Sequence, residues 1–68
     1  MNRASYEERM LGVLRYISEH LDQPISLEDL ARQAHFSPFH FHRIFSGMMG
    51  ESVMSHIRRL RLERAAFK

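Results

Sequence analysis

Apolar residues recur at steps of three and four along the first third of the chain, and this spacing constrains the fold more than any other feature. These residues are Tyr6, Met10, Val13, Leu14, Ile17 and Leu21. Such steps place side chains on one face of an α-helix, whereas a half-buried strand would alternate strictly. Asp22, Gln23 and Pro24 follow, and a proline disfavours helical conformation in the residue before it. We therefore predict an amphipathic helix over about residues 5–21.

Serine, proline and glycine mark the limits of the next helices. The side chain of Ser26 can accept a hydrogen bond from the amide of Asp29, which predicts the start of a second helix. Ser37 directly precedes Pro38, and proline is well tolerated at the first position of a helix because its missing N–H would have no partner there. Gly50 is the best candidate for the left-handed residue that ends this third helix.

These signals predict an all-α fold class, a bundle of about four helices. The predicted helices span about residues 5–21, 27–35, 38–48 and 52–68. The second and third are short and close together, which is typical of a helix-turn-helix and equally of an ordinary helical hairpin, so both remain open at this point. No stop signal precedes Lys68. We therefore expect a fragment of a longer protein, with the fourth helix cut short.

The composition limits the class of protein. A chain of 68 residues forms one small domain, and without cysteine it has no disulfide or thiolate metal site. The lack of cysteine fits a reducing compartment. The N-terminus has no apolar segment of the signal-peptide type, and the apolar runs are too short to cross a membrane. We therefore expect a soluble, cytoplasmic protein with no membrane partner.

Charge is distributed unevenly along the chain. Residues 1–34 contain four arginines against six acidic residues, a balance of −2, whereas residues 35–68 contain five arginines and one lysine against two acidic residues, a balance of +4. Four of the five histidines also lie in the second half. This asymmetry favours an anionic partner, nucleic acid first, although a solvated helix can carry such an imbalance by chance.

The third predicted helix has two opposed faces when its residues are placed on a helical wheel. The apolar face, which we predict to be core, contains Phe41, Ile44, Phe45 and Met48. The opposite face contains Phe39, His42, Arg43 and Ser46, with His40 at the border. This outer face has the shape and the chemistry of a binding surface.

A metal site and a catalytic site are the first alternatives for the histidines of this segment. His40 and His42 are two residues apart on a helix, so they point in nearly opposite directions and cannot share an ion. No Cys, Asp or Glu lies between residues 30 and 50 to complete a site. Catalysis would need a deep pocket, and Ser37 is already explained as a cap. We expect no metal, no cofactor and no enzymatic activity.

The outer face suits the major groove of DNA. Arg43 can make a bidentate contact to guanine O6 and N7, while Phe39 can contact a thymine methyl group. His42 can donate to or accept from a base edge, depending on its tautomer. In the alternative interpretation Phe39 packs against the preceding helix and contacts no partner.

Residues 25–66 resemble the first half of the DNA-binding region of AraC-family transcriptional regulators. The residues that carry the resemblance are Leu27, Leu30, Ala31, Ala34, Ser37, Phe41, Arg43, Phe45, Gly50, Ser52, Ile57, Arg61 and Ala65. The resemblance implies a homeodomain-like helix-turn-helix unit that binds double-stranded DNA sequence-specifically in transcription control, with the third helix in the major groove. It also implies that the fourth helix is a linker to a second unit, which is absent here.

The resemblance assigns roles to individual residues. It implies base contacts by Phe39, His42 and Arg43, and phosphate contacts by Ser37, His40 and Ser46. His56 occupies a position that is usually aromatic in the family. A start at Met1 resembles the subgroup in which a gyrase-inhibitor-like effector domain follows, so a small-molecule effector would act only through that missing domain. RNA polymerase is an implied partner of the full-length protein.

The fourth predicted helix carries two apolar stripes and four arginines. One stripe contains Val53, Ile57 and Leu60, and the other, which we expect to be exposed, contains Met54, Leu62 and Ala65. The arginines are Arg58, Arg59, Arg61 and Arg64, of which we assign Arg58 and Arg59 to DNA phosphates. A solvated basic helix explains them equally well. Exposed Phe39, Leu62 and Phe67 leave a protein–protein interaction module without DNA binding as the alternative function.

Overall fold

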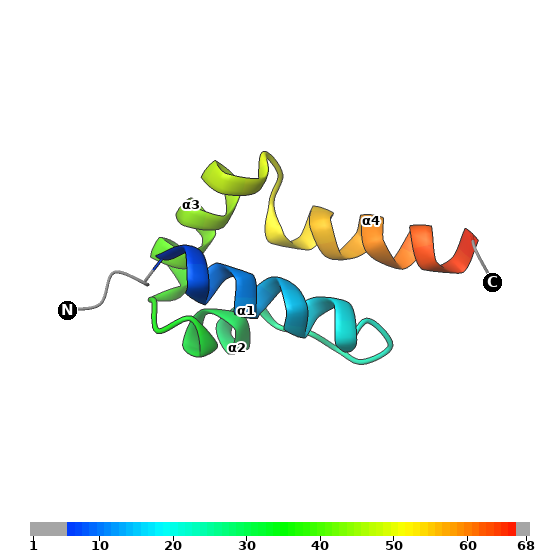
Figure 1. The fold of residues 1–68 in the computed structure, drawn as a ribbon, viewed down its shortest axis with the longest axis horizontal. Coiled ribbons are helices and arrows are strands. Elements are labelled where there is room, and N and C mark those ends of the chain that lie inside the picture. Colours follow the sequence, from blue (N-terminus) through cyan, green and yellow to red (C-terminus); the bar gives the residue numbers. More distant parts are fainter. Residues whose placement is uncertain (1–5, 67–68) are drawn as a thin grey trace.

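Four helices joined by short turns make up the computed structural model, which describes residues 6–66 (Figure 1). In chain order they are α1 (Tyr6–Glu19), α2 (Leu27–Gln33), α3 (Pro38–Met49) and α4 (Val53–Ala66). No strand occurs within residues 6–66, which confirms the predicted all-α fold class. Residues 5, 67 and 68, where two of the predicted helices begin or end, lie outside the described part of the chain. Within that part, no helix is long and apolar enough to span a membrane.

α1 ends earlier than its apolar spacing predicted. The helix buries Met10, Val13 and Ile17 of the predicted stripe and stops at Glu19, not at residue 21. The ring Nδ1 of His20 lies 2.8 Å from the carbonyl oxygen of Tyr16, and the backbone amide of His20 donates to Ile17. This tighter, 3₁₀-type turn ends the α-helix. Leu21 nevertheless remains in the core, with 7% of its surface exposed.

Backbone hydrogen bonds, and not a glycine, close the turn between α2 and α3. The amide of Phe36 donates to the carbonyl of Ala31 at 2.9 Å, and that of His35 donates to Arg32 at 3.1 Å. This pair of bonds defines the Schellman motif. His35 takes the left-handed position with φ 62°. α2 therefore ends at Gln33, two residues before the predicted end, because His35 has a left-handed backbone conformation that cannot continue the helix.

The left-handed backbone of His35 leads to a stability prediction. We expect His35→Gly to stabilise the chain by about 1 kcal/mol, because glycine adopts positive φ without the steric cost of a side chain. Chemical denaturation measures this change. The same substitution at His42, inside α3, is the control and should destabilise the chain by about 1 kcal/mol. A loss of stability at position 35 would mean that the His35 side chain makes a contact that outweighs the strain.

The predicted caps of α2 and α3 are confirmed. The Ser26 hydroxyl accepts from the amide of Asp29 at 3.1 Å, and the Ser37 hydroxyl accepts from the amide of His40 at 3.2 Å. Gly50 ends α3 with φ 76°, as predicted from its position. These caps fix both ends of α3, the helix that carries the candidate site.

The buried face of α3 corresponds to the predicted one except at its last turn. Phe41 and Phe45 are fully buried, and Ile44 is half-buried against them. Met48 is 48% exposed, so its assignment to the core is wrong. The last turn of α3 projects beyond the other helices (Figure 1), and Met49 packs against the core in its place.

α4 begins one residue later than predicted because Ser52 is its cap. The Ser52 hydroxyl accepts from the amide of Ser55 at 3.1 Å, so the helix starts at Val53. Val53 and Ile57 are buried, and Leu60 packs against the same core. The second stripe is exposed as predicted, with Met54 at 50% and Leu62 at 64%.

Two arginines of α4 tie this helix to the last turn of α1 and the loop after it. Arg61 donates from Nε to the carbonyl oxygen of Leu21 and from Nη2 to that of Gln23, both at 2.9 Å. Arg64 donates to the carbonyl oxygen of Ser18 at 2.8 Å. α4 therefore runs beside α1 (Figure 1), and these two guanidinium groups serve the fold.

Candidate nucleic-acid interface

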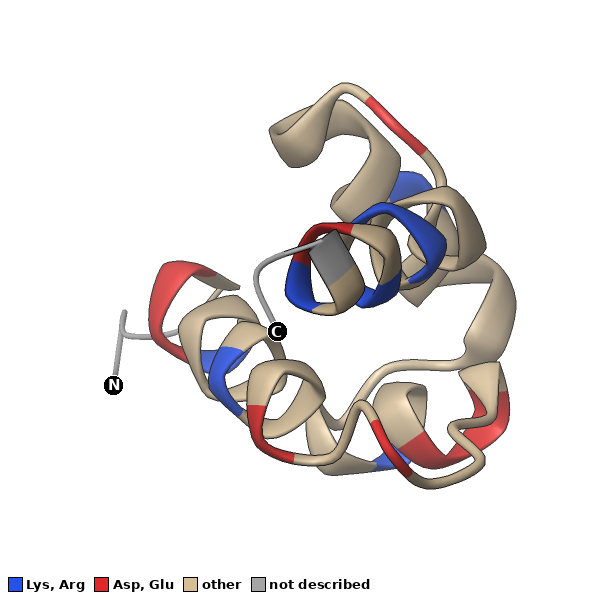
Figure 2. Cartoon of the chain, turned by 90° about the vertical axis from the view of Figure 1, so that its right-hand side faces the viewer, with Lys and Arg blue, Asp and Glu red and all other residues tan. Residues whose placement is uncertain are grey.

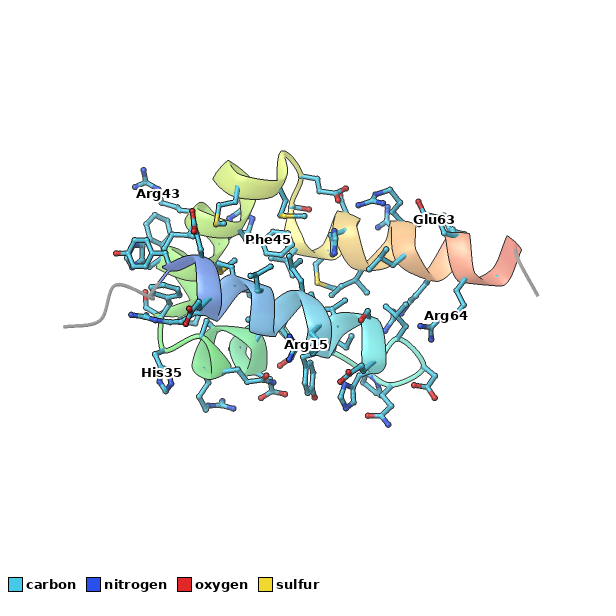
Figure 3. All side chains as sticks on the ribbon, viewed as in Figure 1. Arg15, His35, Arg43, Phe45, Glu63 and Arg64 are labelled. Atoms are coloured by element: carbon cyan, nitrogen blue, oxygen red, sulfur yellow. The ribbon has the colours of Figure 1, made fainter. Side chains whose placement is uncertain are left out.

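The outer face of α3 presents the three residues predicted to contact bases. Phe39 is 73% exposed, and His42 and Arg43 are exposed as well. Arg43 points away from the bundle (Figure 3), and its Cζ lies 5.9 Å from the centre of the Phe39 ring. The exposure of Phe39 excludes the alternative in which its ring packs against the preceding helix. An aromatic ring and a cation thus stand together on an open helix face.

An aromatic cluster supports the first turn of α3. The ring of His40 makes T-shaped contacts with two aromatic rings, with centroid distances of 5.1 Å to Phe36 and 6.3 Å to Tyr6. The Cζ of Arg9 lies 4.6 Å from the Phe36 ring centre, and its Nη1 donates to the carbonyl oxygen of Ala34 at 3.1 Å. Arg9 thereby fixes the turn that precedes α3. Sequence reasoning missed Arg9, because its partner lies 25 residues away.

The residues predicted to contact phosphates lie at the N-cap of α3, along α3 and on α4. Ser37 and His40 are exposed at the start of α3, whereas Ser46 is half-buried two turns further on. Arg58 is exposed on α4 and has no ion pair with any residue from 6 to 66. Arginines are grouped along α4, while acidic residues lie mainly on α1 and α2 (Figure 2). The positive charge of the second half of the sequence is therefore also separated in space from most of the acidic residues.

Arg59 differs from Arg58, because its guanidinium is held by two carboxylates. Its Nη2 lies 2.6 Å from Glu51 Oε2, and its Nη1 lies 3.2 Å from Glu63 Oε2. Hydrogen bonds to Glu51, and then to Glu63, raise the pKa of Arg59. The bonds from Arg59, and then from His56, lower the pKa of the Glu51 carboxyl. A phosphate contact by Arg59 would have to replace these partners.

His56 completes this network from the buried side. Its Nδ1 lies 3.0 Å from Glu51 Oε2, and its ring meets the ring of Phe45 edge-on, with centroids 5.4 Å apart. Only 6% of the residue is exposed. The histidine thus makes the packing contact of an aromatic residue while its nitrogen is hydrogen-bonded.

A short helix, a tight turn and a second helix with an exposed, basic outer face define a helix-turn-helix unit of the DNA-binding type. Residues 17–58 match the family described as bacterial regulatory helix-turn-helix proteins, AraC family. The chain belongs to the AraC family. This confirms the resemblance inferred from the sequence, and with it the predicted class of protein.

Curated relatives agree with this assignment. The uncharacterized HTH-type transcriptional regulator YbfP of Bacillus subtilis (strain 168) is 46% identical over 61 residues, which cover 90% of this chain and 21% of that protein. The right origin-binding protein of Escherichia coli (strain K12) is 37% identical over 59 residues, 81% of this chain and 20% of that protein. The chain thus spans about a fifth of the length of these relatives. The family and its members support sequence-specific DNA binding in transcription regulation.

Proposed function

We propose that α3 enters the major groove of double-stranded DNA and contacts base edges through Phe39, His42 and Arg43. The observation that carries this proposal is the division of α3, whose buried Phe41 and Phe45 leave the opposite face open. The guanidinium of Arg43 can donate two hydrogen bonds to one guanine, and the Phe39 ring can contact a thymine methyl group. His42 supplies a donor or an acceptor between them.

Phosphate contacts flank this helix in the proposal. Ser37 and His40 stand at the start of α3, and the Ser37 hydroxyl can donate to a phosphate while it accepts from the backbone. Ser46 lies further along α3, and Arg58 offers an exposed charge on α4. Arg59 joins this set only when its carboxylate partners release it. Such contacts position the unit on DNA and carry no sequence information.

The remaining functions belong to the whole protein of which a chain like this would form one unit. We propose that residues 1–68 are a single helix-turn-helix subdomain and that α4 links it to a second unit. In such a regulator, RNA polymerase would be a protein partner, and a small-molecule effector would bind a separate domain. The chain itself would act on chromosomal DNA, in the cytoplasm, with no catalytic step.

The salt dependence of binding to a duplex tests this function. Each phosphate contact that is neutralised contributes about 0.9 to the slope of log K against log salt concentration. We expect a negative slope for the chain, and for Arg58→Gln a slope that is shallower by about 0.9. Arg15→Gln on α1 (Figure 3) is the matched control, since Arg15 is exposed far from α3, and its slope should equal that of the unaltered chain.

The second candidate function, a protein–protein interaction module, is favoured by the exposed apolar residues Phe39, Met54 and Leu62. Phe67, which the sequence also suggested, lies outside the described residues. An apolar protein interface has little salt dependence, in contrast to phosphate contacts. Absence of duplex binding at low salt, in a chain that is folded by circular dichroism, would favour this alternative.

A further inference from the structure

His56 is a buried titratable group at the junction of α3 and α4, and the proposed base and phosphate contacts do not involve it. Its side chain is 7% exposed. Nδ1 lies 3.0 Å from Glu51 Oε2 and 3.2 Å from Arg59 Nη2. From α3, the neighbour is the uncharged ring of Phe45. Within residues 6–66 the charges in this network are those of Glu51 and Arg59, and of Glu63 through Arg59; α1 and α2 contribute no hydrogen bond to it.

The two contacts at Nδ1 exclude each other. A guanidinium can only donate hydrogen bonds and a carboxylate can only accept them. An Nδ1 without a hydrogen therefore accepts from Arg59. An Nδ1 that carries a hydrogen donates to Glu51 and cannot accept from Arg59. When both ring nitrogens are protonated, only the second arrangement remains. In the neutral ring the tautomer decides between the two arrangements. Protonation of His56 removes the arrangement in which the histidine accepts from Arg59.

The network around His56 carries a net negative charge while the histidine is neutral. Glu51 and Glu63 carry two negative charges and Arg59 carries one positive charge, so a proton on His56 brings the sum from −1 to zero. The pKa of Glu51 is lowered by its hydrogen bonds from Arg59 and His56, so this carboxylate stays charged in mildly acidic solution. An imidazolium 3.2 Å from the Arg59 guanidinium repels it. The Arg59 side chain is already 47% exposed and can leave toward solvent.

We propose that His56 is a positioning residue for Arg59. Neutral His56, in the tautomer with an unprotonated Nδ1, helps Glu51 to hold Arg59 against α4. Protonated His56 takes over Glu51 Oε2 and leaves Arg59 with two contacts, 3.4 Å from Nε to Glu51 Oε1 and 3.2 Å from Nη1 to Glu63 Oε2. A DNA phosphate replaces these two contacts. The inference rests on the proposed function, since DNA supplies the anion. Part of the DNA affinity of the chain therefore depends on pH through His56, and binding strengthens as the pH falls.

The test measures binding of the chain to a labelled duplex at several salt concentrations, from about pH 8 to about pH 5.5, a range that covers the usual titration of histidine. We expect the release of Arg59 to contribute about 0.9 to the steepening of the salt slope of the unaltered chain as the pH falls, because the released Arg59 then neutralises one further phosphate. His56→Phe keeps a ring against Phe45 but cannot take up a proton, so it should lose this increment. Arg59→Gln should lose the same increment, and the double variant should lose no more than either. Any titration of His40 and His42 is common to all four proteins and cancels in the comparison.

An unchanged pH increment in folded His56→Phe, or in Arg59→Gln, would overturn the proposal. If His56→Phe does not fold, NMR of the unaltered chain decides. The chemical shifts of the His56 ring protons and of the Arg59 Nε–H should change with the same midpoint pH. Chemical shifts of the His56 ring that do not change in this range would refute the mechanism. Because NMR needs no DNA, it separates the two proposals. If the chain binds no duplex at any pH, the proposed function is refuted, but the NMR measurement still tests the exchange between His56 and Arg59.

Discussion

Replacing Phe45 with alanine is expected to leave most of the chain unfolded at 25 °C. Phe45 is fully buried, and its ring packs against those of Phe41 and His56, with centroids 5.9 Å and 5.4 Å away. Truncation of a buried phenylalanine costs about 3–5 kcal/mol. At about 0.05–0.15 kcal/mol per residue, a domain of this size has a total stability of similar magnitude. Circular dichroism during thermal and chemical denaturation measures the loss.

Phe39→Ala is the matched control, because it removes the same side chain from the opposite face of α3. Phe39 is 73% exposed, so we expect its removal to change the stability by no more than about 0.5 kcal/mol. It should instead weaken DNA binding. A larger loss of stability at position 39 than at position 45 would mean that the two faces of α3 are assigned the wrong way round.

Arg43→Ala is expected to weaken specific DNA binding by about 1–3 kcal/mol and to relax the preference at one or two base pairs. The physical reason is the loss of a bidentate contact to a base edge, which only some sequences can offer. Titration of a binding site and of its single-base variants measures both effects. The fold should be retained, since the Arg43 side chain points into solvent (Figure 3).

The pattern of the loss across sequences decides the role of Arg43. A loss restricted to certain bases supports direct contact with the groove, whereas a uniform loss would reassign Arg43 to a phosphate. Arg15→Ala, on the acidic side of the molecule, serves as the control and should leave both affinity and base preference unchanged.

The candidate base-contacting face could be predicted because it depends on helical periodicity alone. Once Ser37 and Gly50 fix the ends of α3, the burial of Phe45 determines that Arg43 faces outward, with no need to know what covers the core. Periodicity could not predict the exposure of Met48. That exposure depends on where the neighbouring helices end, which is a property of their packing.

The roles of the arginines could not be predicted from the sequence. Arg9, Arg61 and Arg64 all donate to backbone carbonyls of residues 25 to 46 positions away, and no local pattern indicates such partners. Arg59 has a local partner in Glu63, four residues later, but its shortest ion pair is with Glu51, eight residues earlier, which no helical spacing indicates. The positive charge of the sequence therefore overstates how many guanidinium groups of α4 are available to DNA.

The sequence by itself determined the four helices, the caps Ser26, Ser37 and Gly50, and the two faces of α3 up to its last turn. Caps and periodicity act over three to four residues, within reach of local chemistry. The left-handed His35, the buried His56 and the partners of each arginine were decided only by the tertiary structure. These three features arise when separate segments pack together. They are a left-handed backbone conformation at a residue other than glycine, the burial of a polar ring, and a backbone carbonyl that accepts from a distant donor.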